Sequence, residues 1–580
     1  MASQPNVILV ITDDQGYADL GCTGNPWLET PHIDAFSKDA VRCHDFHVSP
    51  LCTPTRGALM TGRYPLRNGA WATAWGRSIL KRDELTMADI FRHNGYATGL
   101  FGKWHLGDTY PYRPQDRGFD KVVAHKGGGV GQTPDYWGNN YFDDTYFHNG
   151  EPVSHEGYCT DIWFDEAQQF ITECNDKPFF AVISTNAPHT PYFVDSKYAE
   201  RYRNTPDILE PEFYGMITNI DENFGKLRMF LQDNNLYDNT VLVFMTDNGS
   251  SGGARVDEDS FVTAGYNAGM RGIKGSYYEG GHRVPFFVQC PNLGLVSRDV
   301  HDLVNHIDLL PTLMELCRLE PPQPTAFDGI SIAPSLYGES QDLTQRTVFM
   351  QNNQRMQPPE LWHCAVLQDR WRLIAGQELY NVHDDPEQRV DLAQIHPDKV
   401  TELRAAHLAF WAEVARDIAK PCYHLLGNPA ENPTRLDAMD LMGDIAWDQP
   451  HVLEGLKTSG HWAVEVDHTG MFEISLRRWP AELRLPICDR PAGENLSINQ
   501  RHGASGQCVA LPFVGASLTV NGQRYTQTIQ PQDEDIVFKL ELPTFQGALE
   551  AYFETAEGEL WAAYYVYITR LEEGRVNSSS

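Results

Sequence analysis

Short apolar runs recur through the first half of this chain, and each is followed at once by polar or glycine residues. The runs span residues 7–11, 98–101, 179–183, 241–245 and 284–288. Runs of this length without alternation are typical of strands that are buried on both faces of a sheet. The segments between them, such as 161–174 and 212–232, carry apolar residues at helical spacing. The sequence therefore predicts an α/β domain with a central, mostly parallel sheet.

The pattern changes along the chain, and four regions follow from it. We expect the α/β domain over residues 1–335. A small antiparallel α+β subdomain is expected over 336–432, because strand-like runs near 347–374 precede a helical stretch near 397–420. Beyond it, alternating segments such as 462–466 and 538–542 predict a β-sandwich-like C-terminal domain over 433–573. Residues 574–580 are expected to form a flexible tail.

Charge and composition exclude several classes of function. The 46 Lys and Arg residues against 78 Asp and Glu residues give a net charge of −32, which argues against nucleic-acid binding. No apolar run approaches the ~20 residues that span a bilayer, so no membrane association is expected. The N-terminus lacks a basic segment, and the eleven cysteines are scattered without a Cys-x-x-Cys pair. Both features predict a cytoplasmic chain with mostly free thiols, unless a leader has been removed.

Two acidic pairs follow two of the predicted strands. Asp13 and Asp14 come after the first run, and Asp247 and Asn248 come after the fourth. Such pairs are common turn and cap residues. Ligands of open α/β sheets bind beyond the carboxyl ends of the strands, however, and these side chains are hard oxygen donors. The sequence therefore predicts a site for Ca²⁺, with Mg²⁺ as the alternative.

A segment around Cys52 carries the most specific motif. Cys52 is followed by Pro54 and Arg56, and Thr61-Gly62-Arg63 lies downstream. This arrangement resembles the signature of the type I sulfatases of the alkaline phosphatase superfamily, in which the cysteine is oxidised to formylglycine by a maturation enzyme. The resemblance implies an alkaline-phosphatase-like fold and a hydrated aldehyde at position 52. Such a hydrate offers one oxygen to attack sulfur and a second whose deprotonation releases sulfate.

Further segments match the family in the same order, from residue 6 to about 392. They include Gly102-Lys103-Trp104-His105, Ala187-Pro188-His189 and Gly272-Ile273-Lys274. The resemblance implies that Asp13, Asp14, Asp247 and Asn248 bind the metal together with residue 52. It also implies catalytic roles for Cys52, Arg56, Lys103, His105, His189 and Lys274, with His189 as the general acid and His105 as the final base.

The resemblance implies an arylsulfatase-like hydrolase of sulfate monoesters, whose substrate is a small-molecule or sugar sulfate. The alternatives are a formylglycine-dependent hydrolase of phosphonate monoesters or phosphodiesters, and a non-catalytic carbohydrate-binding protein. His47 and His282 are interpreted as structural, and Asp135, Tyr136, Trp137 and Asn140 as candidates for shaping the substrate mouth. The C-terminal domain is where we expect a contact between copies of the chain, if it forms a homo-oligomer.

Overall fold

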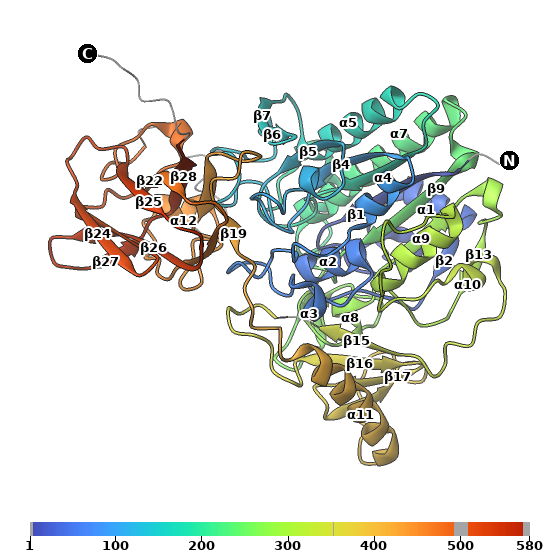
Figure 1. Ribbon diagram of the computed structural model, residues 1–580. Helices are drawn as coiled ribbons and strands as arrows, with labels where there is room; N and C mark the ends of the chain where they lie inside the picture. Colours follow the sequence, from blue (N-terminus) through green and yellow to red (C-terminus); the bar gives the residue numbers. More distant parts are fainter. Residues whose placement is uncertain (1–3, 352, 492–507, 572–580) are drawn as a thin grey trace.

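The fold contains three regions, each built on its own β-sheets (Figure 1). A computed structural model describes residues 4–351, 353–491 and 508–571. A ten-stranded sheet occupies the first region, a four-stranded sheet lies below it in Figure 1, and two further sheets form the orange and red region at the C-terminal end. The expected tail at 574–580 lies outside the described residues.

The ten-stranded sheet has the order β13-β2-β12-β9-β1-β8-β4-β5-β6-β7. Its centre is parallel, because β1 pairs in parallel with β8 and β9, and β4 with β8 and β5. This confirms the predicted mostly parallel sheet. The strands are β1 (Asn6–Thr12), β2 (Val41–Cys43), β4 (Ala97–Lys103), β5 (Lys121–His125), β6 (Thr145–His148), β7 (Glu151–Ser154), β8 (Phe179–Ser184), β9 (Thr240–Thr246), β12 (Phe286–Gln289) and β13 (Arg298–Val300).

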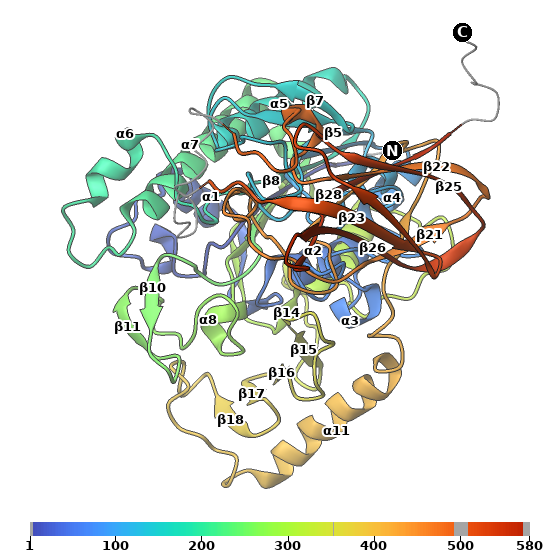
Figure 2. The ribbon, with the colours of Figure 1, turned by 90° about the vertical axis from the view of Figure 1, so that its left-hand side faces the viewer.

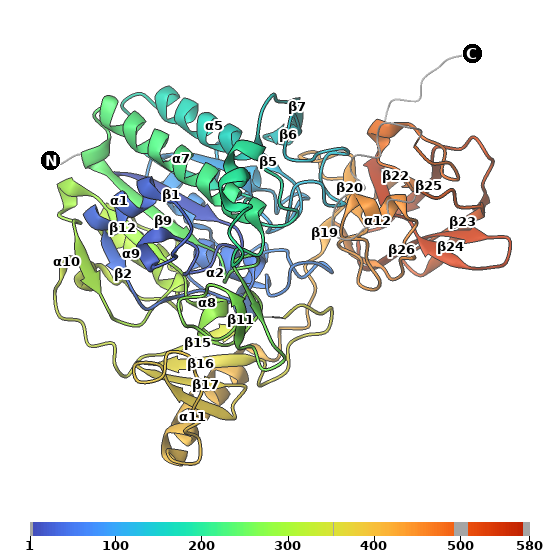
Figure 3. The ribbon, with the colours of Figure 1, turned by 180° about the vertical axis from the view of Figure 1, so that it is seen from behind.

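Helices cover both faces of this sheet (Figure 3). Val7, Leu9 and Ile11 of β1 belong to one apolar core, and Ile8 and Val10 to the other, which is why the strand is apolar throughout. The first core includes side chains of α4 (Met87–His93), α9 (Leu309–Cys317) and α10 (Ala333–Tyr337). The second includes side chains of α1 (Pro31–Asp39), α5 (Cys159–Glu173) and α7 (Pro211–Asp233).

One strand runs against the expected direction. The run at 284–288 was expected among the parallel strands, but β12 is antiparallel to β9. Between the two strands the chain forms the hairpin of β10 (Ala254–Val256) and β11 (Val262–Gly265) and the short helix α8 (Glu279–His282). No helix crosses the sheet in this stretch. The chain therefore re-enters from the edge where β9 ended, and a strand that enters there must run in the opposite direction.

The second region is an antiparallel sheet of four consecutive strands, β15 (Thr347–Gln351), β16 (Cys364–Gln368), β17 (Trp371–Ile374) and β18 (Glu378–Asn381). Leu403 and Phe410 of α11 (Pro397–Val414) share an apolar core with Val366 and Leu373 of this sheet. The sheet and helix together form the small α+β arrangement that the sequence predicts.

The C-terminal region packs two sheets over a single apolar core (Figure 2). Trp462 and Phe553 enter this core from one sheet, and Ile474 and Ile568 from the other. The first sheet contains β19 (His424–Leu425), β21 (Trp462–Val466), β23 (Phe513–Val520), β24 (Gln523–Thr528), β26 (Phe545–Thr555) and β27 (Leu560–Ala562). The second contains β20 (Thr434–Asp437), β22 (Gly470–Arg477), β25 (Ile536–Leu542) and β28 (Tyr565–Arg570).

The remaining elements are short. They are β3 (Phe46–His47), β14 (Val304–Asn305), α2 (Cys52–Thr61), α3 (Pro65–Asn68), α6 (Ser196–Ala199) and α12 (Gln449–Leu453). Each of the eleven cysteines is a free thiol. Across residues 4–351, 353–491 and 508–571, no helix combines the length and the apolar character that crossing a membrane requires.

Candidate functional site

The parallel strands β1, β4, β8 and β9 end at one edge of the sheet, and the predicted residues meet there. Asp13 and Asp14 follow β1, Asp247 and Asn248 follow β9, and His189 lies in the loop after β8. Lys103 ends β4, and His105 follows it. Cys52 and Arg56 come from α2, and Lys274 lies in the loop before α8. Hydrogen bonds, ion pairs and close approaches of ligand atoms connect all ten residues into one cluster.

Cys52 is the first residue of α2 and only 3% exposed. A group at this position faces the positive end of the helix dipole. Arg56 lies one turn further on the same face of the helix. Burial raises the pKa of the Cys52 thiol above its usual value, despite the neighbouring Lys103. An unmodified Cys52 is therefore a neutral thiol and a weak nucleophile.

Acidic groups surround Cys52 closely enough to hold a cation. Ligand atoms of Asp13, Cys52 and Asp247 lie within 4.8 Å of one another. Burial and the neighbouring Asp13 raise the pKa of Asp247 to about 7. The buried oxygens Asp13 Oδ1 and Asn248 Oδ1 accept no hydrogen bond from any described residue. Buried oxygens without a donor, beside carboxylates that repel each other, fit a hard divalent cation such as Ca²⁺ or Mg²⁺.

Three basic side chains pair with the three carboxylates. Arg56 Nη2 lies 2.8 Å from Asp247 Oδ2, Lys103 Nζ 2.7 Å from Asp13 Oδ2, and Lys274 Nζ 2.6 Å from Asp14 Oδ2. Burial alone would raise the pKa of Asp14, but Lys274, His189 and Lys103 hold it well below its usual range. The charges of these six groups balance. A bound divalent cation would leave the cluster positive, which suits an anionic substrate although the whole chain is strongly acidic.

The tautomer of His105 follows from its hydrogen bonds. Its Nε2 lies 3.0 Å from the carbonyl oxygen of Thr73, which can only accept, so Nε2 carries the proton. The other nitrogen, Nδ1, lies 3.5 Å from Sγ of Cys52. Burial, together with Lys103, lowers the pKa of His105 well below its usual value. His105 therefore presents a neutral nitrogen with a free lone pair to residue 52.

His189 has a similar arrangement on the other side of the cluster. Its Nδ1 donates to the carbonyl oxygen of Thr190 at 2.6 Å, and its Nε2 lies 3.7 Å from Asp14 Oδ2. Burial lowers the pKa of His189 to about 3, against the effect of the Asp14 carboxylate. A bound anion favours the charged form of a nearby imidazole, so substrate binding would raise this pKa.

A cavity of about 330 Å³ opens over Cys52, and its wall includes residues that the sequence analysis missed. His105, His189 and Lys274 line it as predicted. Gly128 also lines it, in a glycine-rich loop, residues 127–131, that the sequence places beside the active site, and the unpredicted lining residues are Leu51, Thr73, Gln132, Gln354, Trp447, Asp448 and His451. The sequence analysis missed these residues because they lie far apart in the sequence and form no recognisable motif. The start of α12, where Asp448 is the N-cap and Pro450 follows, gives a helix signal but no sign of a cavity.

The residues expected to shape the substrate mouth do not line this cavity. Asp135 is buried and accepts hydrogen bonds from the backbone of Gly131 and from Asn139. Trp137 joins the core of the C-terminal region, where its ring meets that of Trp479 at 5.6 Å, edge to face. Asp135 and Trp137 therefore support the loop beside the cavity and do not line it.

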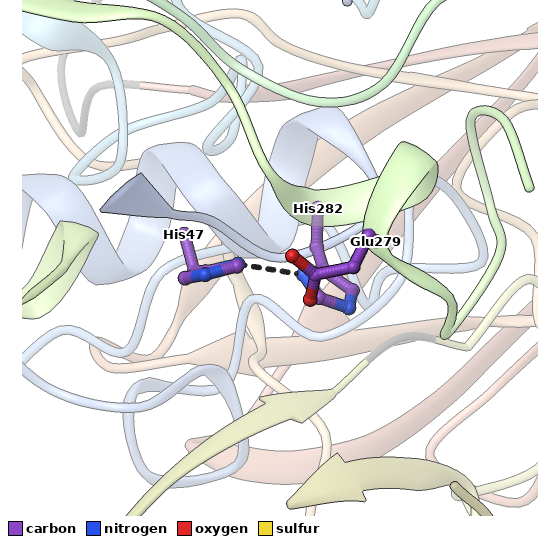
Figure 4. Close-up of side chains that lie close together, drawn as sticks. All are labelled: His47, Glu279 and His282. Carbon is purple, nitrogen blue, oxygen red and sulfur yellow. Dashed lines mark hydrogen bonds between the residues drawn. The ribbon is translucent and has the colours of Figure 1, made fainter. Parts of the chain in front are cut away.

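A second buried cluster contains His47, Glu279 and His282 (Figure 4). The two Nδ1 atoms of the histidines are 2.8 Å apart, and His47 Nε2 lies 2.8 Å from Asp45 Oδ1. Glu279 Oε1 is occupied by Arg372 Nε at 2.8 Å. A hydrogen-bonded histidine pair beside a paired carboxylate fits a structural network better than a metal site. This network joins α8, which follows the Lys274 loop, to the strand that precedes Cys52, and its contacts agree with a structural role for His47 and His282.

Comparisons with known proteins agree with this geometry. Residues 5–319 match the profile of a family described as Sulfatase, and residues 274–408 match one described as N-sulphoglucosamine sulphohydrolase, C-terminal. Arylsulfatase A from Homo sapiens is 28% identical over 523 residues, covering 85% of this chain and 94% of that protein. N-acetylgalactosamine-6-sulfatase from Homo sapiens is 29% identical over 360 residues, covering 57% and 66%.

A solved structure extends the similarity to three dimensions. The crystal structure of Ps i-CgsB in complex with k-i-k-neocarrahexaose superposes with a TM-score of 0.63 at 28% sequence identity. The superposition covers 71% of this chain and 93% of that chain.

Proposed function

The chain belongs to the sulfatase family, the type I sulfatases of the alkaline phosphatase superfamily, and from this premise we propose how its own residues hydrolyse a sulfate monoester. The observation that carries the proposal is the cluster around Cys52, where three carboxylates, three basic groups and two histidines converge. The names Arylsulfatase A and N-acetylgalactosamine-6-sulfatase refer to an aryl and a sugar sulfate. They support sulfate esters as the substrate class and leave the alcohol open.

The nucleophile in this proposal is residue 52 after a maturation enzyme has converted Cys52 to formylglycine. The hydrated aldehyde supplies one hydroxyl that loses its proton to solvent and attacks sulfur, and a second whose deprotonation later releases the sulfate. A buried neutral thiol supplies neither. The modification therefore explains why a cysteine stands at the base of this cavity.

Asp13, Asp14, Asp247 and Asn248 would hold a divalent cation together with residue 52. We favour Ca²⁺, with Mg²⁺ as the alternative, because the donors are oxygens and include an uncharged amide. A bound cation supplies positive charge beside the oxygens of residue 52 and of the sulfate. The buried oxygens Asp13 Oδ1 and Asn248 Oδ1 support this assignment, because they accept no hydrogen bond from any described residue.

The remaining residues manage charge and protons. Arg56, Lys103 and Lys274 offset the negative charge on the sulfate oxygens in the transition state. As the ester S–O bond breaks, His189 gives the leaving alkoxide its proton. His105 then accepts the proton of the second hydroxyl through Nδ1, the carbonyl of residue 52 re-forms, and the bond from that residue to sulfate breaks.

Mass spectrometry of the tryptic peptide 43–56 tests the proposal, using protein made in cells with an active maturation system. We expect an aldehyde at residue 52, and hydrolysis of 4-nitrophenyl sulfate well above that of a phosphonate monoester such as phenyl phenylphosphonate. An unmodified thiol in protein that still hydrolyses sulfate esters would refute the formylglycine mechanism. A preference for the phosphonate ester would refute the assigned substrate class.

A further inference from the structure

We propose that residues 447–451 of the C-terminal region form a wall of the substrate cavity, and that Trp447, Asp448 and His451 select a hydroxyl-rich alcohol as the leaving group. This inference rests on the proposed sulfatase reaction and adds the class of alcohol that it releases. All three residues line the cavity over Cys52. Residues 409–580, which contain this wall, lie beyond both matching family profiles.

Hydrogen bonds fix the wall to the catalytic region. The backbone N–H of Thr133 donates to the carbonyl of Trp447 at 2.9 Å, and Gln132 and Asp448 form an antiparallel bridge. The side chain of Gln449 donates to the carbonyls of Gln132 and Tyr136. The wall therefore holds a fixed position beside the cavity, as a specificity site requires.

A second set of contacts links the wall to the catalytic base. Gln132 Oε1 accepts a hydrogen bond from the backbone N–H of Gly128 at 2.7 Å. Gly128 lies so close to His105 that a Cβ built on it would come within 2.3 Å of the imidazole ring. The alcohol-binding wall and His105 are thus separated by a single loop, residues 127–132.

The polar groups of the wall have defined roles. Asp448 and His451 form a capping box at the start of α12, in which the Asp448 backbone N–H donates to His451 Nδ1 at 3.2 Å. Because Nδ1 accepts, the proton of the neutral His451 ring sits on Nε2, which becomes a donor. One carboxylate acceptor, one ring donor and an indole face are a combination that binds a ring with hydroxyl groups. The amides of Gln132 and Gln354 add both donors and acceptors.

The same groups disfavour two other kinds of alcohol. An unsubstituted aryl group would bury these donors and acceptors without partners, and a site built for hydroxyls discriminates strongly against such ligands. A second sulfate or carboxylate beside Asp448 would be repelled. We therefore expect a neutral sugar or polyol sulfate as the preferred substrate.

The test compares kcat/KM for 4-nitrophenyl sulfate with that for glucose 6-sulfate and galactose 6-sulfate. In wild-type enzyme we expect the better sugar ester to be hydrolysed at a readily measured rate. In His451→Ala and, separately, Asp448→Asn, the ratio of sugar to nitrophenyl kcat/KM should fall about tenfold, mainly through a higher KM for the sugar ester. Asn keeps an oxygen that can cap α12, so this variant preserves the helix start.

His468→Ala is the matched control, because the His468 side chain lies in the same region, is 66% exposed and, among the described residues, forms an ion pair only with the half-buried Asp467. It should leave the ratio unchanged. An unchanged ratio in both wall variants would overturn the inference, as would wild-type enzyme that hydrolyses the nitrophenyl ester and neither sugar ester. Wild-type enzyme that hydrolyses none of the three would instead refute the proposed function, and with it this inference.

Discussion

The α/β region and the C-terminal β region both contribute to the cavity, but they do so in different ways. In the α/β region, the catalytic candidates lie after strand ends, in the first turns of α2 or in the loop before α8, all at one edge of the sheet. In the C-terminal region, the strands pack a core, and among its described residues the short segment at the start of α12 alone lines the cavity. The comparison suggests a division of labour, in which one region carries the chemistry and the other selects the alcohol.

The largest expected effect comes from removing the proposed nucleophile in the α/β region. Cys52→Ala should lower kcat/KM for 4-nitrophenyl sulfate by at least about 10⁴-fold, because the nucleophile is lost. Steady-state assays at matched protein concentration measure this. Cys22→Ser, at an exposed free cysteine, is the control and should keep full activity. Retained activity in Cys52→Ala would place the nucleophile elsewhere and break the comparison.

The pH dependence of stability tests the carboxylate cluster. Burial and Asp13 raise the pKa of Asp247 to about 7 in the folded protein. The folded state therefore binds this proton more tightly than the unfolded state, so its contribution to stability is complete below about pH 4 and is lost as pH rises through about 7. In a chelator, wild-type protein should lose on the order of a few kcal/mol over this range through Asp247.

Asp247→Asn should lose less stability over the same pH range, because Asn does not titrate. The difference between the two unfolding profiles therefore reports the titration of Asp247 together with its coupling to Asp13. Adding Ca²⁺ should stabilise the wild type most at neutral pH, since the cation replaces the proton. If the unfolding free energies of wild type and Asp247→Asn changed equally with pH in the presence of a chelator, the described charge cluster would be wrong.

Loss of the general acid should depend on the leaving group. His189→Ala should slow an alkyl sulfate by roughly 100-fold and 4-nitrophenyl sulfate by only a few-fold, because nitrophenolate leaves without a proton. The ratio of the two kcat/KM values measures this. Equal losses on both esters would remove His189 from the acid role and leave Lys274 as the candidate.

The smallest effect concerns the joint between the two regions. Gln449→Ala removes three hydrogen bonds, to Gln132, Tyr136 and Gly138, and should cost roughly 1–3 kcal/mol of stability. Thermal unfolding measures the loss, and Gln546→Ala, at an exposed position in β26, serves as the control. If Gln449→Ala unfolds like wild type, the regions are held together by other contacts.

The sequence predicts the site residues of the α/β region better than those of the C-terminal region, for physical reasons. Asp13 and His105 could be predicted because the residues that follow parallel strands lie together at one edge of the sheet. The direction of β12 could not, because its apolar run reads the same in either direction. Asp448 and His451 could not be predicted either, since a cavity wall built from a separate region depends on docking. Trp137 was misinterpreted because an aromatic residue near a glycine loop fits a mouth and a core equally well.

The contact between Gly128 and His105 has a consequence for engineering. A Cβ at Gly128 would come within 2.3 Å of the imidazole, so this loop packs against the base only while position 128 is a glycine. An exchange of the C-terminal region between relatives would therefore succeed only if residues 127–138 were exchanged together with it. The boundary that matters for recombination lies in this loop, about 300 residues before the domain boundary that the sequence predicts at residue 433.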